Sequence, residues 1–206
     1  MPDAEAASDD RPLVERTALV LLAAGRSSRF GEGRNKLDQD LHGLPLGLHA
    51  AVALAPLPFL ARVAVVAGAE LNFSAHGFAV IRNDDPGAGM ARSLRLGIEA
   101  AERLGADAAV VVLADMPCVT AAHVERLFDA AERGADVVAS TDGESASPPA
   151  LFGRAHFAGL KALSGDAGAR DLIRAARHIV ASAAELVDVD TSAALDRLRA
   201  KRGGRV

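Results

Sequence analysis

A glycine-rich loop with three basic side chains is the part of the chain best suited to bind phosphate. Residues 22–31 read LAAGRSSRFG, and Lys36 follows five residues later. Glycines let the backbone approach a ligand closely, and serine hydroxyls and exposed N–H groups can donate to phosphate oxygens. Arg26, Arg29 and Lys36 add positive charge within the same stretch. This composition predicts a loop that binds a polyphosphate.

Two widespread phosphate loops have other spacings. A P-loop needs Gly-Lys-Ser/Thr after its second glycine, but Glu-Gly-Arg-Asn separates Gly31 from Lys36. The dinucleotide fingerprint needs GxGxxG, which Gly25, Gly31 and Gly33 do not form. The spacing therefore excludes both motifs and leaves, as the alternative, a surface loop that is simply rich in glycine and arginine.

Carboxylates follow two of the expected strands and could hold a cation. Asp115 comes just after the apolar run 108–113, and Asp188 and Asp190 end a last expected strand, on one face because side chains alternate. Mg²⁺ prefers oxygen ligands and usually binds one or two carboxylates together with substrate phosphates. The alternatives are a helix N-cap for Asp115 and a carboxylate without a metal for Asp190.

Alternating strands and helices must position these groups. Apolar runs and turn residues predict strands at 17–22, 61–67, 78–82, 108–113, 136–140, 150–152 and one ending near 190. Helices are predicted at 46–55, 91–104, 120–133, 155–163 and 192–200. The pattern indicates an α/β fold, a Rossmann-like and mainly parallel sheet with helices on both faces in three α/β/α layers. The carboxyl edge of such a sheet is where ligands bind.

Composition limits the function classes. The 206 residues are 50% hydrophobic, which predicts a single domain over 17–200 after a flexible tail at 1–16. A net charge of -4 without Trp or Tyr argues against a nucleic-acid partner. Short apolar runs argue against a membrane partner and favour a cytoplasmic protein. The single cysteine, Cys118, allows no internal disulfide.

The motifs resemble the MobA-like NTP transferase family, and within it the MocA-like molybdenum cofactor cytidylyltransferases. The opening signature of that family, LAAGxSxRxG…K, is met by residues 22–31 and Lys36. Further matches occur in the same order, from Thr17 to about Leu195: NDDPGAGMARSL at 83–94, LADMP at 113–117, GDAGAR at 165–170 and VDVDT at 187–191.

The resemblance implies an enzyme that transfers CMP from CTP to the phosphate of a molybdopterin-type cofactor and releases pyrophosphate, with Mg²⁺ as cofactor. It implies as further partner a molybdoenzyme or its maturation chaperone. The catalytic residues it implies are Arg29, Lys36 and Asp115, and the metal ligands are Asp115 and Asp190. The nucleotide-binding residues it implies are Leu22, Ala23, Ala24, Gly25, Arg26, Ser27, Ser28, Gly89, Met90 and Ser93. The acceptor-binding residues, within about 141–175, are Pro149, Asp166, Gly168 and Arg170.

Two segments depart from the family pattern. Residues 147–150 read SPPA where the family has glycine, a polar residue and proline, and residues 192–194 read SAA in place of Pro-Glu-Asp. CTP rather than GTP is expected because residues 23–25 read AAG, where the guanylyltransferase branch has a Gly-Gly pair. The open alternatives are a guanylyltransferase, a sugar- or alcohol-phosphate nucleotidyltransferase, and a non-catalytic cofactor-binding maturation protein.

Overall fold

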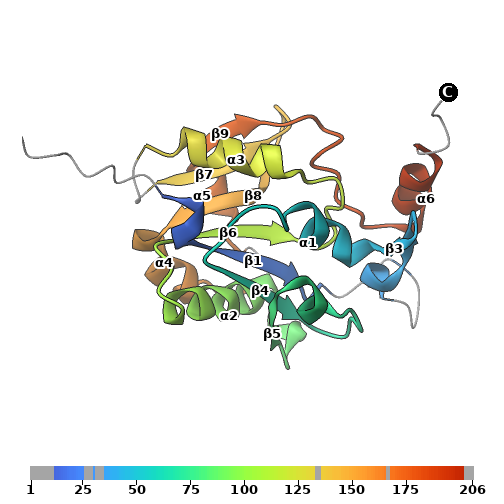
Figure 1. Cartoon of the computed structure of the whole chain (residues 1–206), viewed down its shortest axis with the longest axis horizontal. Coiled ribbons are helices and arrows are strands. Elements are labelled where there is room, and N and C mark those ends of the chain that lie inside the picture. Colours follow the sequence, from blue (N-terminus) through green and yellow to red (C-terminus); the bar gives the residue numbers. More distant parts are fainter. Residues whose placement is uncertain (1–11, 26–29, 31–34, 133–135, 166–167, 202–206) are drawn as a thin grey trace, which may run out of the picture.

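A seven-stranded sheet forms the centre of the protein (Figure 1). The computed structural model describes residues 12–25, 30, 35–132, 136–165 and 168–201. The strand order is β5-β4-β1-β6-β8-β7-β9. The strands are β1 (Thr17–Ala23), β4 (Ala61–Val66), β5 (Ala79–Arg82), β6 (Ala108–Leu113), β7 (Val137–Thr141), β8 (Ala146–Gly153) and β9 (Arg177–Val180). Only β8 runs antiparallel to its neighbours in this sheet, so the predicted mainly parallel sheet is confirmed.

Helices cover both faces of the sheet because alternate strand residues point to opposite sides. Leu19 and Leu21 of β1 pack toward one face, which α1 (His49–Ala53) and α3 (Ala121–Ala130) cover. Val20 of the same strand packs toward the other face. That face is covered by three helices, α2 (Met90–Arg103), α4 (Phe157–Ala162) and α5 (Arg170–Ala175). In Figure 1 α3 lies above the sheet and α2 below it, which confirms the three layers.

Short elements complete the fold. The hairpin of β2 (Asp40–Leu41) and β3 (Leu44–Pro45) lies beside helix α6 (Ser192–Lys201), apart from the main sheet (Figure 1). Leu41 and Leu46 pack there with Leu195 and Leu198 of α6. The 3-10 turns are η1 (Val14–Arg16), η2 (Lys36–Asp38), η3 (Leu46–Leu48), η4 (Phe73–His76), η5 (Pro86–Ala88) and η6 (Arg154–His156).

The second half of the chain differs most from the sequence prediction. The prediction of a strand that ends near 190 is wrong, because residues 181–191 form turns and irregular chain. In this half of the chain, α5 and β9 were not predicted. Strand β8 begins at Ala146, inside the proline-containing run that reads as a loop. The register between β7 and β8 shifts at Ala139/Ser140 and skips the two prolines, so that neither proline occupies a paired ladder position there.

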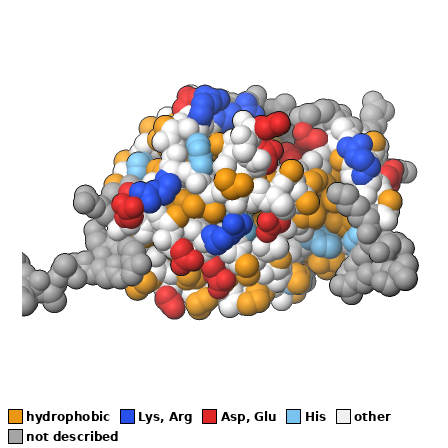
Figure 2. Space-filling view, turned by 90° about the horizontal axis from the view of Figure 1, so that it is seen from above, with side chains coloured by type: hydrophobic (Ala, Val, Ile, Leu, Met, Phe, Trp, Pro, Cys, Tyr) orange, Lys and Arg blue, Asp and Glu red, His pale blue; other side chains and the backbone are white. Residues whose placement is uncertain are grey.

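The face of the molecule shown in Figure 2 carries both acidic and basic side chains. Basic and acidic side chains are interspersed with hydrophobic ones over the described part of this face. None of the helices in the described ranges is long and apolar enough to cross a membrane.

Candidate functional site

The candidate site lies where β1 and β6 end at the carboxyl edge of the sheet. The Ala114 N–H donates to the Leu22 carbonyl at 3.0 Å, so the segments that leave the two strands start side by side. Leu22 and Ala23 are buried in the two cores and can reach a ligand only through their backbone. Gly25 is exposed, with open space where a Cβ would stand. Arg26, Ser27, Ser28 and Arg29 lie outside the described residues, as does Asp166.

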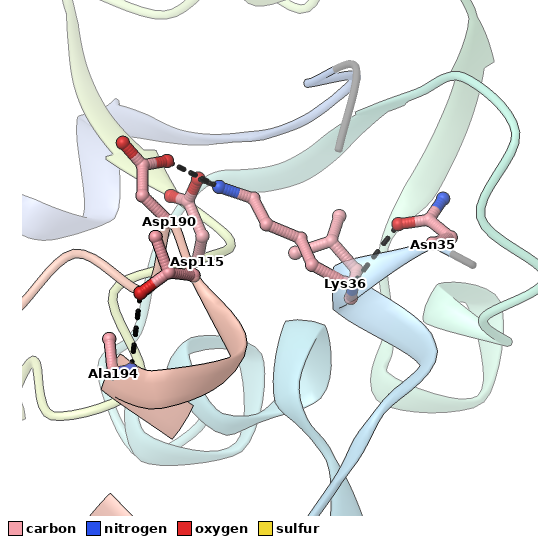
Figure 3. A network of polar contacts seen from close by, with 7 residues as sticks. Asn35, Lys36, Asp115, Asp190 and Ala194 are labelled. Carbon is pink, nitrogen blue, oxygen red and sulfur yellow. Dashed lines mark hydrogen bonds and ion pairs between the residues drawn. The ribbon is translucent and has the colours of Figure 1, made fainter. Parts of the chain in front are cut away.

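Lys36 joins two carboxylates at this edge (Figure 3). Its Nζ lies 2.6 Å from Asp115 Oδ2 and 3.0 Å from Asp190 Oδ1, and the residue is 6% exposed. The Asn35 side chain accepts from the Leu37 N–H at 3.0 Å and so caps the turn that carries Lys36. Burial alone would lower the pKa of Lys36, but the negative charges of Asp115 and Asp190 outweigh it and raise the pKa. Lys36 is therefore an ammonium ion at neutral pH.

Three carboxylates converge on this point. One oxygen each of Asp115, Asp188 and Asp190 lies within 4.8 Å of the others. Asp115 Oδ1 is buried, and no donor among the described residues reaches it. Desolvation and the neighbouring charge of Asp115 raise the pKa of Asp188 to about 6, although Lys36 opposes this. A cluster of oxygen donors that includes a buried oxygen with no donor among the described residues fits a hard divalent cation.

Packing rather than a strand places Asp188 and Asp190. The intervening Val189 is 0% exposed, packs with the α6 cluster, and donates its N–H to the Asp115 carbonyl at 3.0 Å. Thr191 then accepts from the Ala194 N–H at 3.2 Å, which caps α6 (Figure 3). Because Val189 points into the core, its two neighbours are directed toward Asp115. The alternation of side chains along the expected strand had placed Asp188 and Asp190 on one face, but the sequence analysis gave Asp188 no role.

Asp188 gives a pH-dependent prediction for stability. Its pKa in the folded protein, about 6, is above the ordinary value of 3.8. The ionised form is thus less favourable in the folded chain than in the unfolded one at neutral pH, and this cost disappears below the ordinary pKa. Asp188→Asn should raise Tm by about 1–3 °C near pH 7.5 and leave it unchanged near pH 3.5. Thermal unfolding at both pH values measures this, and a lower Tm for the variant near pH 7.5 would contradict it.

The segment before α2 is organised by Asn83, whose role the sequence did not reveal. The buried Asn83 side chain donates to Ser93 Oγ at 2.9 Å and accepts from Arg92 Nε at 2.9 Å and from the Asp85 N–H at 3.1 Å. Gly89 precedes the helix with φ +89°, a conformation that favours glycine. Asn83 is the first residue of the NDDPGAGMARSL motif, and this position was the only feature of the sequence that pointed to it. It holds Ser93, one of the predicted nucleotide contacts.

Asn83→Ala should raise the KM for the nucleoside triphosphate by about tenfold, which corresponds to about 1.4 kcal/mol of lost binding. The reason is that Ser93 loses its hydrogen bond from Asn83, and Arg92 loses one of its partners while keeping the ion pair with Asp84. Steady-state kinetics with varied nucleotide measure the change. Asn72→Ala is the matched control, because Asn72 caps η4. Equal effects of the two substitutions would show that the change is not specific to the site.

The acceptor-side residues meet the nucleotide side at Met90. A Cβ on Gly168 would lie 3.2 Å from Met90 Sδ, and the Ala91 N–H donates to the Gly165 carbonyl at 3.1 Å.

Arg170, another of the predicted acceptor-binding residues, is exposed at the first position of α5. Pro149 precedes Ala150, which pairs with Val111 near the carboxyl end of β6. The structure thus brings Lys36, Asp115 and Asp190 into direct contact, and Gly168 against Met90.

Comparison with known proteins identifies the family. Residues 19–181 match the MobA-like NTP transferase domain model. The purine catabolism protein PucB of Bacillus subtilis is 31% identical over 199 residues, which cover 87% of this chain and 94% of PucB. A nucleotidyl transferase from Methanothermobacter thermautotroptrophicus has TM-score 0.75 and 24% identity, covering 90% of this chain and 97% of its own.

A structure of Rv0371C in complex with manganese, from Mycobacterium tuberculosis, has TM-score 0.71 and 22% identity, covering 90% of this chain and 98% of its own. It shares the fold of this chain. The matches confirm the family predicted from the motifs and agree with its MocA-like branch. The chain therefore belongs to the MobA-like NTP transferase domain family, within the nucleotidyltransferase superfamily.

Proposed function

We propose that this nucleotidyltransferase transfers CMP from CTP to the phosphate of a molybdopterin-type cofactor and releases pyrophosphate. The observation that carries the proposal is the contact of Lys36 with Asp115 and Asp190, at the sheet edge where the glycine-rich segment leaves β1. This arrangement supplies an ammonium ion for phosphate oxygens and oxygen ligands for a cation in one place. The product would pass to a molybdoenzyme or its maturation chaperone.

The reaction needs alignment and charge stabilisation more than proton transfer. A phosphate monoester has a second pKa of about 6, so the attacking oxygen is mostly ionised at neutral pH and needs no general base. This oxygen forms a bond to the α-phosphorus, the bond to the bridging oxygen of the β-phosphate breaks, and pyrophosphate leaves with that electron pair. Lys36, together with Arg29, would hold the β- and γ-phosphates as negative charge develops on them.

Magnesium is the proposed cofactor. Asp115 and Asp190 would hold it, and Asp188 lies close enough to contribute. When bound, Mg²⁺ would neutralise charge on the triphosphate oxygens. The donor set of carboxylate oxygens, and the buried Asp115 Oδ1 that no donor in the described ranges reaches, support this choice of a hard cation.

A pyrophosphate-release assay with purified protein, Mg²⁺ and molybdopterin tests the function. Turnover should require both CTP and molybdopterin, and should fall strongly when GTP replaces CTP. Preference for GTP would instead favour the guanylyltransferase alternative.

The altered segment 147–150 favours a second candidate, a maturation protein that binds the cofactor without transferring a nucleotide. Tight cofactor binding with no pyrophosphate from any nucleotide would support that candidate and overturn the first.

A further inference from the structure

A buried chain of polar groups runs from helix α3 to strand β8. Arg126 Nη2 lies 2.8 Å from His123 Nδ1, and His123 Nε2 lies 2.7 Å from Ser140 Oγ. Ser140 Oγ in turn donates to the Pro149 carbonyl at 2.7 Å. His123 is 1% exposed and Ser140 is 0% exposed. Two polar side chains so deeply buried are kept only where their hydrogen bonds are made.

The donor and acceptor of each hydrogen bond can be assigned by starting from the Pro149 carbonyl, the last group of the chain. A carbonyl oxygen only accepts, so Ser140 gives its single proton to Pro149. Ser140 must then accept from the Nε2–H of His123, which leaves Nδ1 as the acceptor for Arg126. Burial and the positive charge of Arg126 lower the pKa of His123, although Glu185 opposes this, so the imidazole is neutral.

The last acceptor in this chain lies at the acceptor side of the site. Strand β8 runs antiparallel to β6, so Pro149 lies near the end of β6 from which Asp115 leaves. In the described pairing of β8 with β7, Pro149 has no partner residue because the register shifts at Ser140, and the described pairing of β8 with β6 ends at Ala150. The Ser140 hydroxyl supplies the donor at the point where the ladder is interrupted.

The same helix is tied to the segment that leads to Asp188 and Asp190. Thr120 caps α3 and donates to Glu185 Oε1 at 2.9 Å, and Arg126 Nη1 donates to the Val180 carbonyl at 3.0 Å. Helix α3 packs over β7, β8 and β9 (Figure 1). It is therefore held in place on both sides of His123, and the imidazole has a fixed position from which to orient Ser140.

We propose that His123 is a positioning residue for the acceptor, because through Ser140 it fixes the backbone of Pro149 on the acceptor side of the site. On the triphosphate side Lys36 contacts Asp115 and Asp190, whereas this chain of groups leads from Arg126 to Pro149. The inference rests on the proposed function, in which the segment at Pro149 contacts the molybdopterin-type acceptor.

Four variants test the inference. Ser140→Ala and His123→Phe break the chain of hydrogen bonds, His123→Gln keeps an N–H donor for Ser140, and Val138→Ala removes buried bulk from β7 without touching a polar group. Ser140→Ala and His123→Phe should raise the KM for molybdopterin by about tenfold and change the KM for CTP and kcat by less than about twofold. His123→Gln should recover most of the affinity. Val138→Ala should lower Tm and leave the KM for molybdopterin unchanged.

Hydrogen exchange of residues 144–152 in the free protein gives a readout independent of activity. Ser140→Ala should speed exchange in this segment, and Val138→Ala should not do so selectively.

Two kinetic results with an active enzyme would overturn the inference and leave the function standing. One is that Ser140→Ala raises the KM for CTP as much as the KM for molybdopterin. The other is that His123→Gln is as impaired as His123→Phe. If the wild-type protein forms no pyrophosphate with CTP and molybdopterin, the proposed function fails. Hydrogen exchange then decides alone: selective acceleration in Ser140→Ala supports the positioning role, and unchanged or general acceleration overturns it.

Discussion

Replacing Asp115 by asparagine should reduce kcat for pyrophosphate release by about 10²–10³-fold, the range seen when one preorganised charge-stabilising group is removed from an active site. Asp115 contacts Lys36 at 2.6 Å and offers a second, buried oxygen to a cation, so its charge serves both groups. Asparagine keeps the shape of the side chain but removes the negative charge and replaces one acceptor oxygen by an NH2 donor. The fold should survive, because the loss also relieves repulsion with Asp188.

Asp107→Asn is the matched control for this change. Asp107 precedes the other end of β6 and pairs with Arg16 at the surface. This variant should keep full activity, since surface ion pairs contribute little. An Asp115→Asn protein with unchanged Tm and with kcat within about threefold of wild type would contradict the proposed role of Asp115.

Replacing Lys36 by methionine should increase the affinity of the free protein for Mn²⁺ by at least about tenfold while reducing turnover. The Lys36 ammonium contacts two of the three clustered carboxylates, so a cation that binds without nucleotide must compete with it. Removing the ammonium leaves three negative charges close together without their internal counter-ion. Calorimetric titration with Mn²⁺ alone measures the affinity, with about 1.4 kcal/mol expected for each tenfold change.

Lys161→Met controls for the loss of a lysine as such. Lys161 pairs with Glu102 at 2.5 Å, between α4 and α2, and belongs to no carboxylate cluster found in the described ranges. Its replacement should change neither Mn²⁺ affinity nor turnover. Unchanged or weaker Mn²⁺ binding in Lys36→Met would show that the ammonium does not compete for the carboxylates.

The sequence predicted the first half of the fold better than the second. Strand β6 is a continuous apolar run, and β1 and β4 are apolar except for Thr17 and Arg62; such runs are typical of parallel strands buried on both faces. Strand β8 was underestimated because Pro148 and Pro149 are poor strand residues, and only the register shift at Ser140 accommodates them. The four exposed or half-exposed residues of β9 carry no hydrophobic alternation that could have revealed a strand at the sheet edge.

The candidate site was predictable where a motif and a strand end coincide. Lys36 and Asp115 followed from their places after β1 and β6, and their direct contact agrees with that expectation. Asn83 was missed because its importance comes from three hydrogen bonds made across a turn, which spacing does not show. The chain of groups through His123 was missed for a similar reason, since an isolated histidine on a helix has no recognisable pattern.

The contact between Lys36 and Asp190 joins residues 154 positions apart in the chain. Closing so long a loop costs conformational entropy before the contact is formed, so contacts of this kind tend to slow folding. Val189, which lies between Asp188 and Asp190, packs against the α6 leucines, so we expect the carboxylate cluster to be completed late, together with this packing. During refolding, the appearance of Mn²⁺ binding should report a late step in which the two ends of the domain meet, after the central strands have already paired.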